Sequence, residues 1–139
     1  MIGEDKKIYL IDFGLAQRFR DPISRNHISF TTGLNLVGTI RYASINAHLG
    51  HQQSRRDDLE SLAYTLLYSI HGTLAWQGMT LHNKGDRCGA VLHRKRDVSN
   101  YIGPAALVTF LHYTRALTFE EAPDYVYLHS LFQNLSEPV

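Results

Sequence analysis

Residues 54–72 read SRRDDLESLAYTLLYSIHG, and they decide the fold because they predict the clearest helix in the chain. The apolar residues recur at i, i+3, i+4, i+7, i+8 and i+11, which is the spacing of one continuous helical stripe. The stripe consists of Leu59, Leu62, Ala63, Leu66, Leu67 and Ile70. Ser54 can cap the start and Gly72 follows the end, so the pattern predicts a buried central helix over about 55–71.

Two shorter runs towards the C-terminus also have helical spacing. Residues 105–117 follow Pro104, which suits the first position of a helix. Their shared face consists of Leu107, Phe110, Leu111, Thr114 and Leu117. Residues 124–135 have the same kind of face, made of Tyr125, Leu128, Leu131, Phe132 and Leu135. Both runs predict helices, so the expected fold class is mainly α.

The N-terminal part of the chain has a different pattern. Residues 8–11 are Ile-Tyr-Leu-Ile, and such a short apolar run predicts a buried strand that ends at the triplet Asp12-Phe13-Gly14. Residues 15–40 show no sustained helical period and are interrupted by glycine and proline. A long irregular stretch inside a compact domain is uncommon and is usually functional. We therefore expect a short β element at the start, followed by a functional loop.

Composition limits the class of protein. The chain has 139 residues, of which 14 are Lys or Arg and 13 are Asp or Glu, so its net charge is +1. This near-balance argues against a general nucleic-acid or membrane-surface binder. The single cysteine, Cys88, cannot form an internal disulfide. The N-terminal sequence has no apolar signal core, and we expect an intracellular location in the cytoplasm or nucleus.

Several short motifs follow one another along the chain. They are IDFGLA (11–16), GTIRYASIN (38–46), HLG (48–50), QSRRDDLESLAY (53–64), WQG (76–78) and PDYVYL (123–128). In this order and at this spacing, the sequence resembles the casein kinase I family of serine/threonine protein kinases. Ser44-Ile45-Asn46 replaces the Ala-Pro-Glu of most kinases, which is typical of this family. The resemblance extends over nearly all of residues 7–135.

The resemblance implies both a fold and an activity. Residues 1–139 would be a partial kinase domain, the large (C-terminal) lobe without the small lobe, with an activation segment over 12–46. The family transfers the γ-phosphoryl group of ATP to serine or threonine hydroxyls of proteins, with magnesium as cofactor. We expect acidic or phosphate-primed protein substrates, and neither a specific nucleic acid nor a membrane as partner.

The resemblance also implies roles for three residues near the reaction. Asp12 matches the aspartate that holds magnesium through the nucleotide. Thr39 falls in the loop that faces the substrate hydroxyl. Asp58 matches a buried aspartate that supports the catalytic loop by accepting backbone hydrogen bonds.

Other basic residues would hold the substrate or the lobe. Arg41 matches a residue that binds a phosphate or acidic side chain of the substrate, and Lys84 and Arg87 match basic residues near that site. Such a cluster can hold an anion through charge-assisted hydrogen bonds. Arg115 matches a structural arginine of the large lobe. We expect residues 94–96 to form a solvated basic face.

The sequence departs from a working kinase in important ways. It contains no glycine-rich loop, strand lysine or catalytic-loop His-Arg-Asp, and a kinase needs all three. We therefore expect no ATP or magnesium binding and no activity from this chain alone. Gln17 and Leu34 replace lysines that contribute to anion binding in the family, and Ala75 replaces a proline. The alternative hypotheses are a non-catalytic, kinase-like interaction module and a truncated gene product.

Overall fold

A computed structural model of the chain describes residues 7–79, 84–97 and 101–133. The helices in these residues are α1 (Ile45–His48), α2 (Arg55–His71), α3 (Lys84–Arg96), α4 (Ala105–Ala116) and α5 (Tyr125–Gln133). The described fold is mainly helical, which confirms the predicted class. None of the described helices combines the length and the apolar character needed to cross a bilayer.

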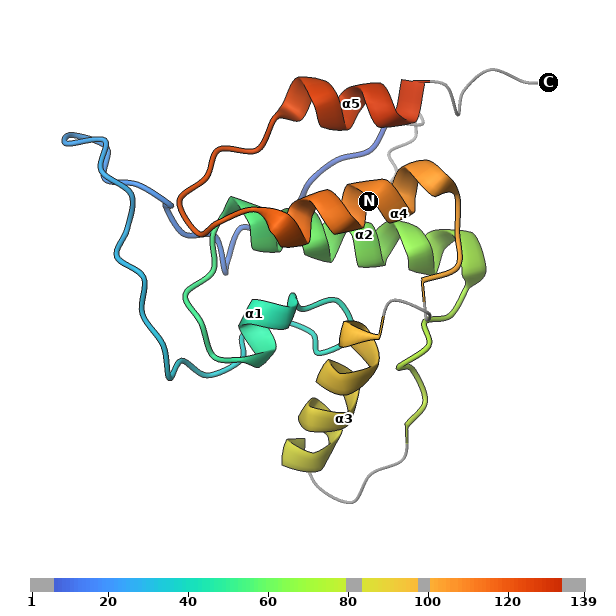
Figure 1. Ribbon diagram of the computed structural model, residues 1–139. Coiled ribbons are helices and arrows are strands. Elements are labelled where there is room, and N and C mark those ends of the chain that lie inside the picture. The colour runs from blue at the N-terminus through green and yellow to red at the C-terminus, as the bar shows by residue number, and fades with distance from the viewer. Residues whose placement is uncertain (1–6, 80–83, 98–100, 134–139) are drawn as a thin grey trace.

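The α2 helix lies at the centre of the fold. It packs along α4, and α5 packs on α4 in turn, while α1 contacts both α2 and α3 (Figure 1). At the start of α2, the Asp57 carboxylate accepts the backbone N–H of Ser54 at 2.9 Å. At its end, Gly72 adopts φ +70° and donates its N–H to the Tyr68 carbonyl. These two caps set the limits that the sequence pattern predicts.

The hydrophobic core lies between α2 and α4 and extends to the turn that follows α2. Its buried members are Ala63, Tyr64, Leu67, Leu74, Trp76, Val91, Tyr101, Leu107, Phe110, Leu111 and Leu128. One edge of the predicted α2 stripe stays outside this core, because Leu62 and Ile70 are 45% and 54% exposed. An apolar stripe predicts burial, but a side chain of the stripe is buried only where another element packs against it.

The strand predicted over 8–11 is not formed in the described structure. Ile8 and Leu10 are 86% and 83% exposed. Ile8 alone of residues 8–11 takes part in an isolated bridge, and another isolated bridge joins Arg20 to His27. A strand needs a partner for its backbone groups and a covering face for its side chains. Residues 8–11 have exposed side chains and a single bridge residue among them, so the prediction of a buried strand over 8–11 is wrong.

The irregular segment, residues 12–44, follows the outside of the helices and leads into α1 (Figure 1). A local turn forms where the Asp21 carboxylate accepts the N–H groups of Ile23 and Ser24, and these hydrogen bonds lower the pKa of Asp21. Two backbone hydrogen bonds then fix the segment to the loop after α1. They join Leu34 N to Gly50 O at 2.9 Å and Gln52 N to Thr31 O at 2.8 Å.

Candidate functional site

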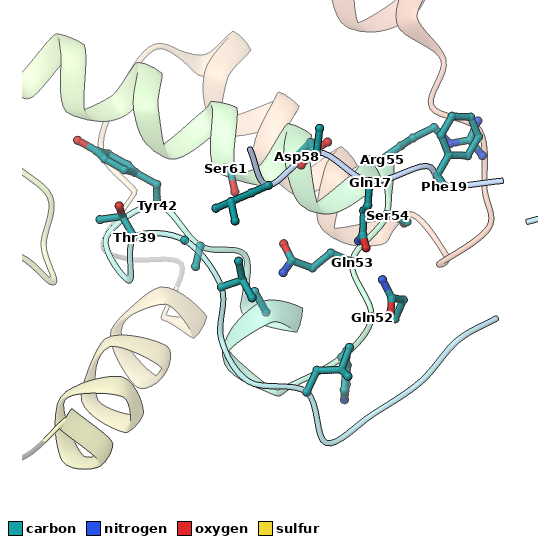
Figure 2. Close-up of a pocket in the computed structure, with 18 of the residues that line it drawn as sticks. Gln17, Phe19, Thr39, Tyr42, Gln52, Gln53, Ser54, Arg55, Asp58 and Ser61 are labelled. Atoms are coloured by element: carbon teal, nitrogen blue, oxygen red, sulfur yellow. The ribbon is translucent and has the colours of Figure 1, made fainter. Parts of the chain in front are cut away.

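A cleft of about 740 Å³ opens between the irregular segment and the first turns of α2. Its polar lining residues are Gln17, Asn35, Thr39, Tyr42, His51, Gln52, Gln53, Ser54, Arg55, Asp58 and Ser61, and apolar residues line the rest. Figure 2 shows Thr39 on one side of the cleft and Gln52 on the other, with Asp58 projecting from α2. Side-chain amides and hydroxyls both donate and accept hydrogen bonds. This lining therefore suits a polypeptide segment, whose backbone offers the same two kinds of group.

The cleft brings together Thr39 and Asp58, two residues that the sequence assigns to different parts of the site. The prediction that Asp58 is buried is wrong, because its side chain is exposed in the described structure. Partial desolvation, and secondly the charge of Asp57, raise the pKa of Asp58. Asp58 is nevertheless a carboxylate that faces an open cleft, where it can accept hydrogen bonds from a bound segment.

The buried carboxylate at the start of α2 is Asp57, which is 1% exposed. Its Oδ1 accepts hydrogen bonds from Ser44 Oγ at 2.7 Å and from Asn46 Nδ2 at 3.0 Å. Asp57 thus ties both polar residues of the Ser-Ile-Asn motif to α2. This role of Asp57 was not predicted from the sequence, although the spacing from Ser54 to an acidic residue three positions later is a signal for a helix cap.

Glu60, one turn further along α2, is a second buried carboxylate. It accepts hydrogen bonds from the Ile45 N–H at 3.3 Å and from the Tyr64 hydroxyl, and it pairs with Arg115 Nε at 3.2 Å. Arg115 thereby connects α4 to α2 and α1. Its position in the described fold is structural, and it lies away from the cleft lining.

Arg41 lies on the loop before α1, and two tyrosine rings hold its side chain. Its guanidinium carbon is 5.2 Å from the centroid of the Tyr68 ring and 5.7 Å from that of Tyr42. Both distances are those of cation–π contacts. Because Tyr42 also lines the cleft, the partly exposed Arg41 charge lies beside it.

Arg41 and Arg87 lie on different elements of the described structure, and no described contact joins them. Arg87 is exposed in the first turns of α3. Figure 1 shows that end of α3 projecting away from α1 and α2. Lys84 opens the helix, and its side chain lies outside the described residues. Arg41 is therefore the one member of the predicted cluster with a defined place beside the cleft.

Asp12 is exposed at φ +62°, and its Oδ1 accepts the Gly14 N–H at 3.2 Å. Within the described ranges, no three His, Cys, Asp or Glu side chains are placed to hold a metal ion. Magnesium in nucleotide sites is commonly held by one or two carboxylates together with phosphate oxygens. Asp12 fits as a single ligand to a phosphate-bound magnesium, but it does not form a metal site by itself.

Two of the predicted departures from the family lie in the cleft. Gln17 and Leu34 both contribute to its lining, from different parts of the irregular segment. At these two positions the cleft is lined by an amide and an apolar side chain, neither of which carries a positive charge. Ala75 lies elsewhere, in the turn before Trp76.

The prediction of a solvated face over 94–96 is wrong for its central residue. Lys95 is 0% exposed, whereas Arg94 and Arg96 are exposed. Lys95 follows the buried Val91 by one helical turn, so α3 directs both residues to the same inner face. A run of three basic residues hides this difference in the sequence.

A comparison with models of known protein families gives no match for this chain. The motifs quoted above and the geometry of the cleft are what support a functional assignment.

Proposed function

We propose that the chain is the large-lobe portion of a casein kinase I-like serine/threonine protein kinase. In this proposal, the cleft receives the catalytic loop and lies next to the substrate-binding surface. The observation that supports the proposal is that Thr39 and Asp58 both line one cleft. The resemblance assigns one of them to the substrate-facing loop and the other to the support of the catalytic loop.

Phosphoryl transfer depends mainly on positioning and on electrostatic stabilisation of the transferred group. Within such a reaction, Asp58 would accept backbone N–H groups of the catalytic loop, and Thr39 would border the substrate hydroxyl. Arg41 would hold a phosphate or carboxylate of the substrate from its place over Tyr68. ATP would supply the phosphoryl group, with Asp12 as one ligand of its magnesium.

A binding experiment tests the role of the cleft. A fluorescent peptide with a casein kinase I catalytic-loop sequence should bind the chain, and Asp58→Asn should weaken that binding about tenfold through loss of charge-assisted hydrogen bonds. Glu120→Gln, an exposed change outside the cleft, is the matched control. Binding of a scrambled peptide with equal affinity, or no effect of Asp58→Asn, would contradict the proposal.

A phosphotransfer assay complements it. The purified chain should not phosphorylate casein, since its sequence lacks the strand lysine and the catalytic-loop aspartate. ATP-dependent turnover that Asp12→Ala abolishes would contradict this expectation.

The second candidate function is a non-catalytic, kinase-like module that presents the Arg41 surface to acidic partners. The observation that favours it is the partly exposed Arg41 guanidinium, which the rings of Tyr68 and Tyr42 hold beside the cleft. The peptide-binding experiment distinguishes the two candidate functions. Retained binding of an acidic peptide without any binding of the catalytic-loop peptide supports the interaction module.

A further inference from the structure

The ammonium group of Lys95 reaches from α3 to the loop that carries Arg41. Its Nζ donates hydrogen bonds to the carbonyl of Ile40 at 3.0 Å and to that of Ala43 at 2.6 Å. The same Nζ lies 3.2 Å from His48 Nε2. All three donors of the ammonium group therefore have a partner, in a place where the side chain is fully buried.

Trp76 adds a further hydrogen bond to the same loop. Its Nε1–H donates to the carbonyl of Arg41 at 2.8 Å. The Lys95 Nζ lies 5.3 Å from the centroid of the Trp76 ring and 4.7 Å from that of Tyr64, so the two donors are packed together. Donors from outside the loop thus hold the carbonyls of residues 40, 41 and 43. We call Lys95 and Trp76 the loop clamp.

We propose that Lys95 is a positioning residue for Arg41: the loop clamp fixes the backbone of residues 40–43 and so holds the guanidinium over Tyr68, ready to receive an anionic group of a protein substrate. The anion-binding part rests on the proposed function. The fixing of the loop does not, because it follows from the contacts alone.

The chemistry of the site explains why a lysine is needed there. Burial of an ammonium group is costly unless every donor is hydrogen-bonded, and an apolar side chain of similar length would fill the same space. Such a side chain could not donate to Ile40 and Ala43, and their carbonyls would then lack a donor from α3. The geometry therefore favours a function in fixing the loop over simple packing.

Several ionisable groups surround Lys95 and make its contacts depend on pH. They are His48 on α1, Glu60 and Tyr64 on α2, Cys88 on α3, Tyr101 before α4, and Arg115 on α4. Desolvation, opposed by the charge of Glu60, lowers the pKa of Lys95 to about 7. Desolvation and the charge of Lys95 lower the pKa of His48 to about 4, so His48 stays neutral near pH 7.

Loss of a proton from Lys95 has a specific consequence at His48. Below pH 7 the ammonium group donates to all three partners, and His48 Nε2 must accept. Above pH 7 the amine keeps two N–H donors for the carbonyls, and its lone pair faces His48 Nε2, which must then carry the hydrogen. The tautomer of neutral His48 should therefore change as Lys95 titrates.

The test combines nuclear magnetic resonance with binding of a peptide of consecutive aspartates. The carboxyl groups of this peptide stay ionised between pH 5.5 and 8.5, because that range lies about 1 unit or more above their ordinary pKa. In the wild-type protein, the ¹⁵N shifts of His48 and the Arg41 Nε–Hε signal should share one inflection near pH 7. Lys95→Met should abolish that inflection, move the Arg41 signal towards its value in an unstructured peptide, and weaken peptide binding about tenfold. Arg96→Met, at the exposed end of α3, is the control and should change neither signal.

The outcomes separate the two parts of the inference. An Arg41 signal with the same position and pH dependence in Lys95→Met overturns the positioning role. If Arg41→Ala leaves peptide affinity unchanged, the anion-binding function fails, while the Arg41 signal still decides whether Lys95 fixes the loop. Should Lys95→Met not fold, Trp76→Phe replaces it, because that variant removes one donor and keeps an aromatic ring. Trp76→Phe should shift the Arg41 signal and retain the inflection, and an unshifted Arg41 signal overturns the positioning role.

Discussion

Arg115 Nε lies 3.2 Å from Glu60 Oε1, and this ion pair joins the last turn of α4 to α2. The Glu60 side chain is 3% exposed and that of Arg115 is 18% exposed, so water screens the pair only weakly. The same carboxylate accepts the backbone N–H of Ile45 at the start of α1. One buried charge pair therefore connects three helices.

Removal of the cation from this pair should destabilise the fold strongly. Arg115→Met should lower the free energy of unfolding by about 3 kcal/mol, because it leaves the buried Glu60 carboxylate without its ion-pair partner. Urea denaturation followed by circular dichroism measures the change. Arg96→Met, an exposed control, should stay within about 0.5 kcal/mol of the wild-type protein. Equal effects of the two variants would show that the pair does not hold the helices together.

The two adjacent aspartates at the start of α2 offer a matched comparison. Asp57→Asn should destabilise the protein by about 1–3 kcal/mol, because Asp57 accepts from Ser44, Asn46 and Ser54, and an amide cannot accept at both positions. Asp58→Asn changes an exposed side chain and should not destabilise it. Chemical denaturation of both variants at pH 7 measures the difference. A greater loss from Asp58→Asn would reverse the assignment of the buried residue.

The raised pKa of Asp58 also predicts that the stability difference between Asp58→Asn and the wild-type protein depends on pH. The folded protein holds the Asp58 proton more tightly than the unfolded chain, so ionisation of this group opposes folding at neutral pH. Asp58→Asn should therefore be slightly more stable than the wild-type protein at pH 7. That gain should disappear as pH falls below the ordinary value of 3.8, where both states are protonated. A gain that grows towards low pH would contradict the raised pKa.

Titration of Lys95 should make the stability of the protein depend on pH above neutrality. Its pKa is about 7 in the folded protein, against an ordinary value of 10.5. Between pH 7 and pH 10.5, Lys95 is therefore protonated in the unfolded chain and neutral in the folded protein. The stability of the wild-type protein relative to Lys95→Met should therefore rise from pH 7 to pH 10.5 and stay level just below pH 7. Denaturant midpoints of both proteins across this range measure it, and a relative stability that falls with increasing pH would refute the depressed pKa.

The sequence could predict α2 because all of its information is local: an apolar stripe, a capping residue and a terminal glycine. It could not predict α3, in which glycines at 85 and 89 weaken the helical pattern and few apolar residues mark a face. The burial of Lys95 was hidden for a further reason, since it depends on carbonyl groups of a loop far away in the sequence. The wrong prediction that Asp58 and not Asp57 is buried has the same cause, because burial depends on which element covers each face of the helix.

The exposed N-terminal segment should promote self-association. Ile8 and Leu10 are 86% and 83% exposed, so a second chain can cover their apolar side chains. The double variant Ile8→Lys/Leu10→Lys should shift the sedimentation profile towards the monomer. Val126→Lys, which changes an equally exposed residue on α5, is the control and should have little effect. An equal shift from both variants would assign the effect to net charge instead of to this segment.

Gly50 tests whether the irregular segment is docked against the loop after α1. Gly50 and Gly72 both adopt φ +70°, so alanine at either position meets the same left-handed backbone strain of about 1–2 kcal/mol. A Cβ at Gly50 would lie 2.7 Å from the Leu34 carbonyl oxygen, whereas one at Gly72 has nothing within 4 Å. Gly50→Ala should therefore cost about 1–3 kcal/mol more than Gly72→Ala, because overpacking against backbone is not easily relieved.

The comparison isolates the docking contact because the backbone strain cancels between the two variants. Gly50→Ala should also break the Leu34 N–Gly50 O hydrogen bond, and hydrogen exchange at the Leu34 amide should then become faster in this variant alone. Since Leu34 lines the cleft, a loosened segment should in addition weaken binding of the catalytic-loop peptide. Equal stability of the two alanine variants, with unchanged exchange at Leu34, would mean that the segment is not held against this loop in solution.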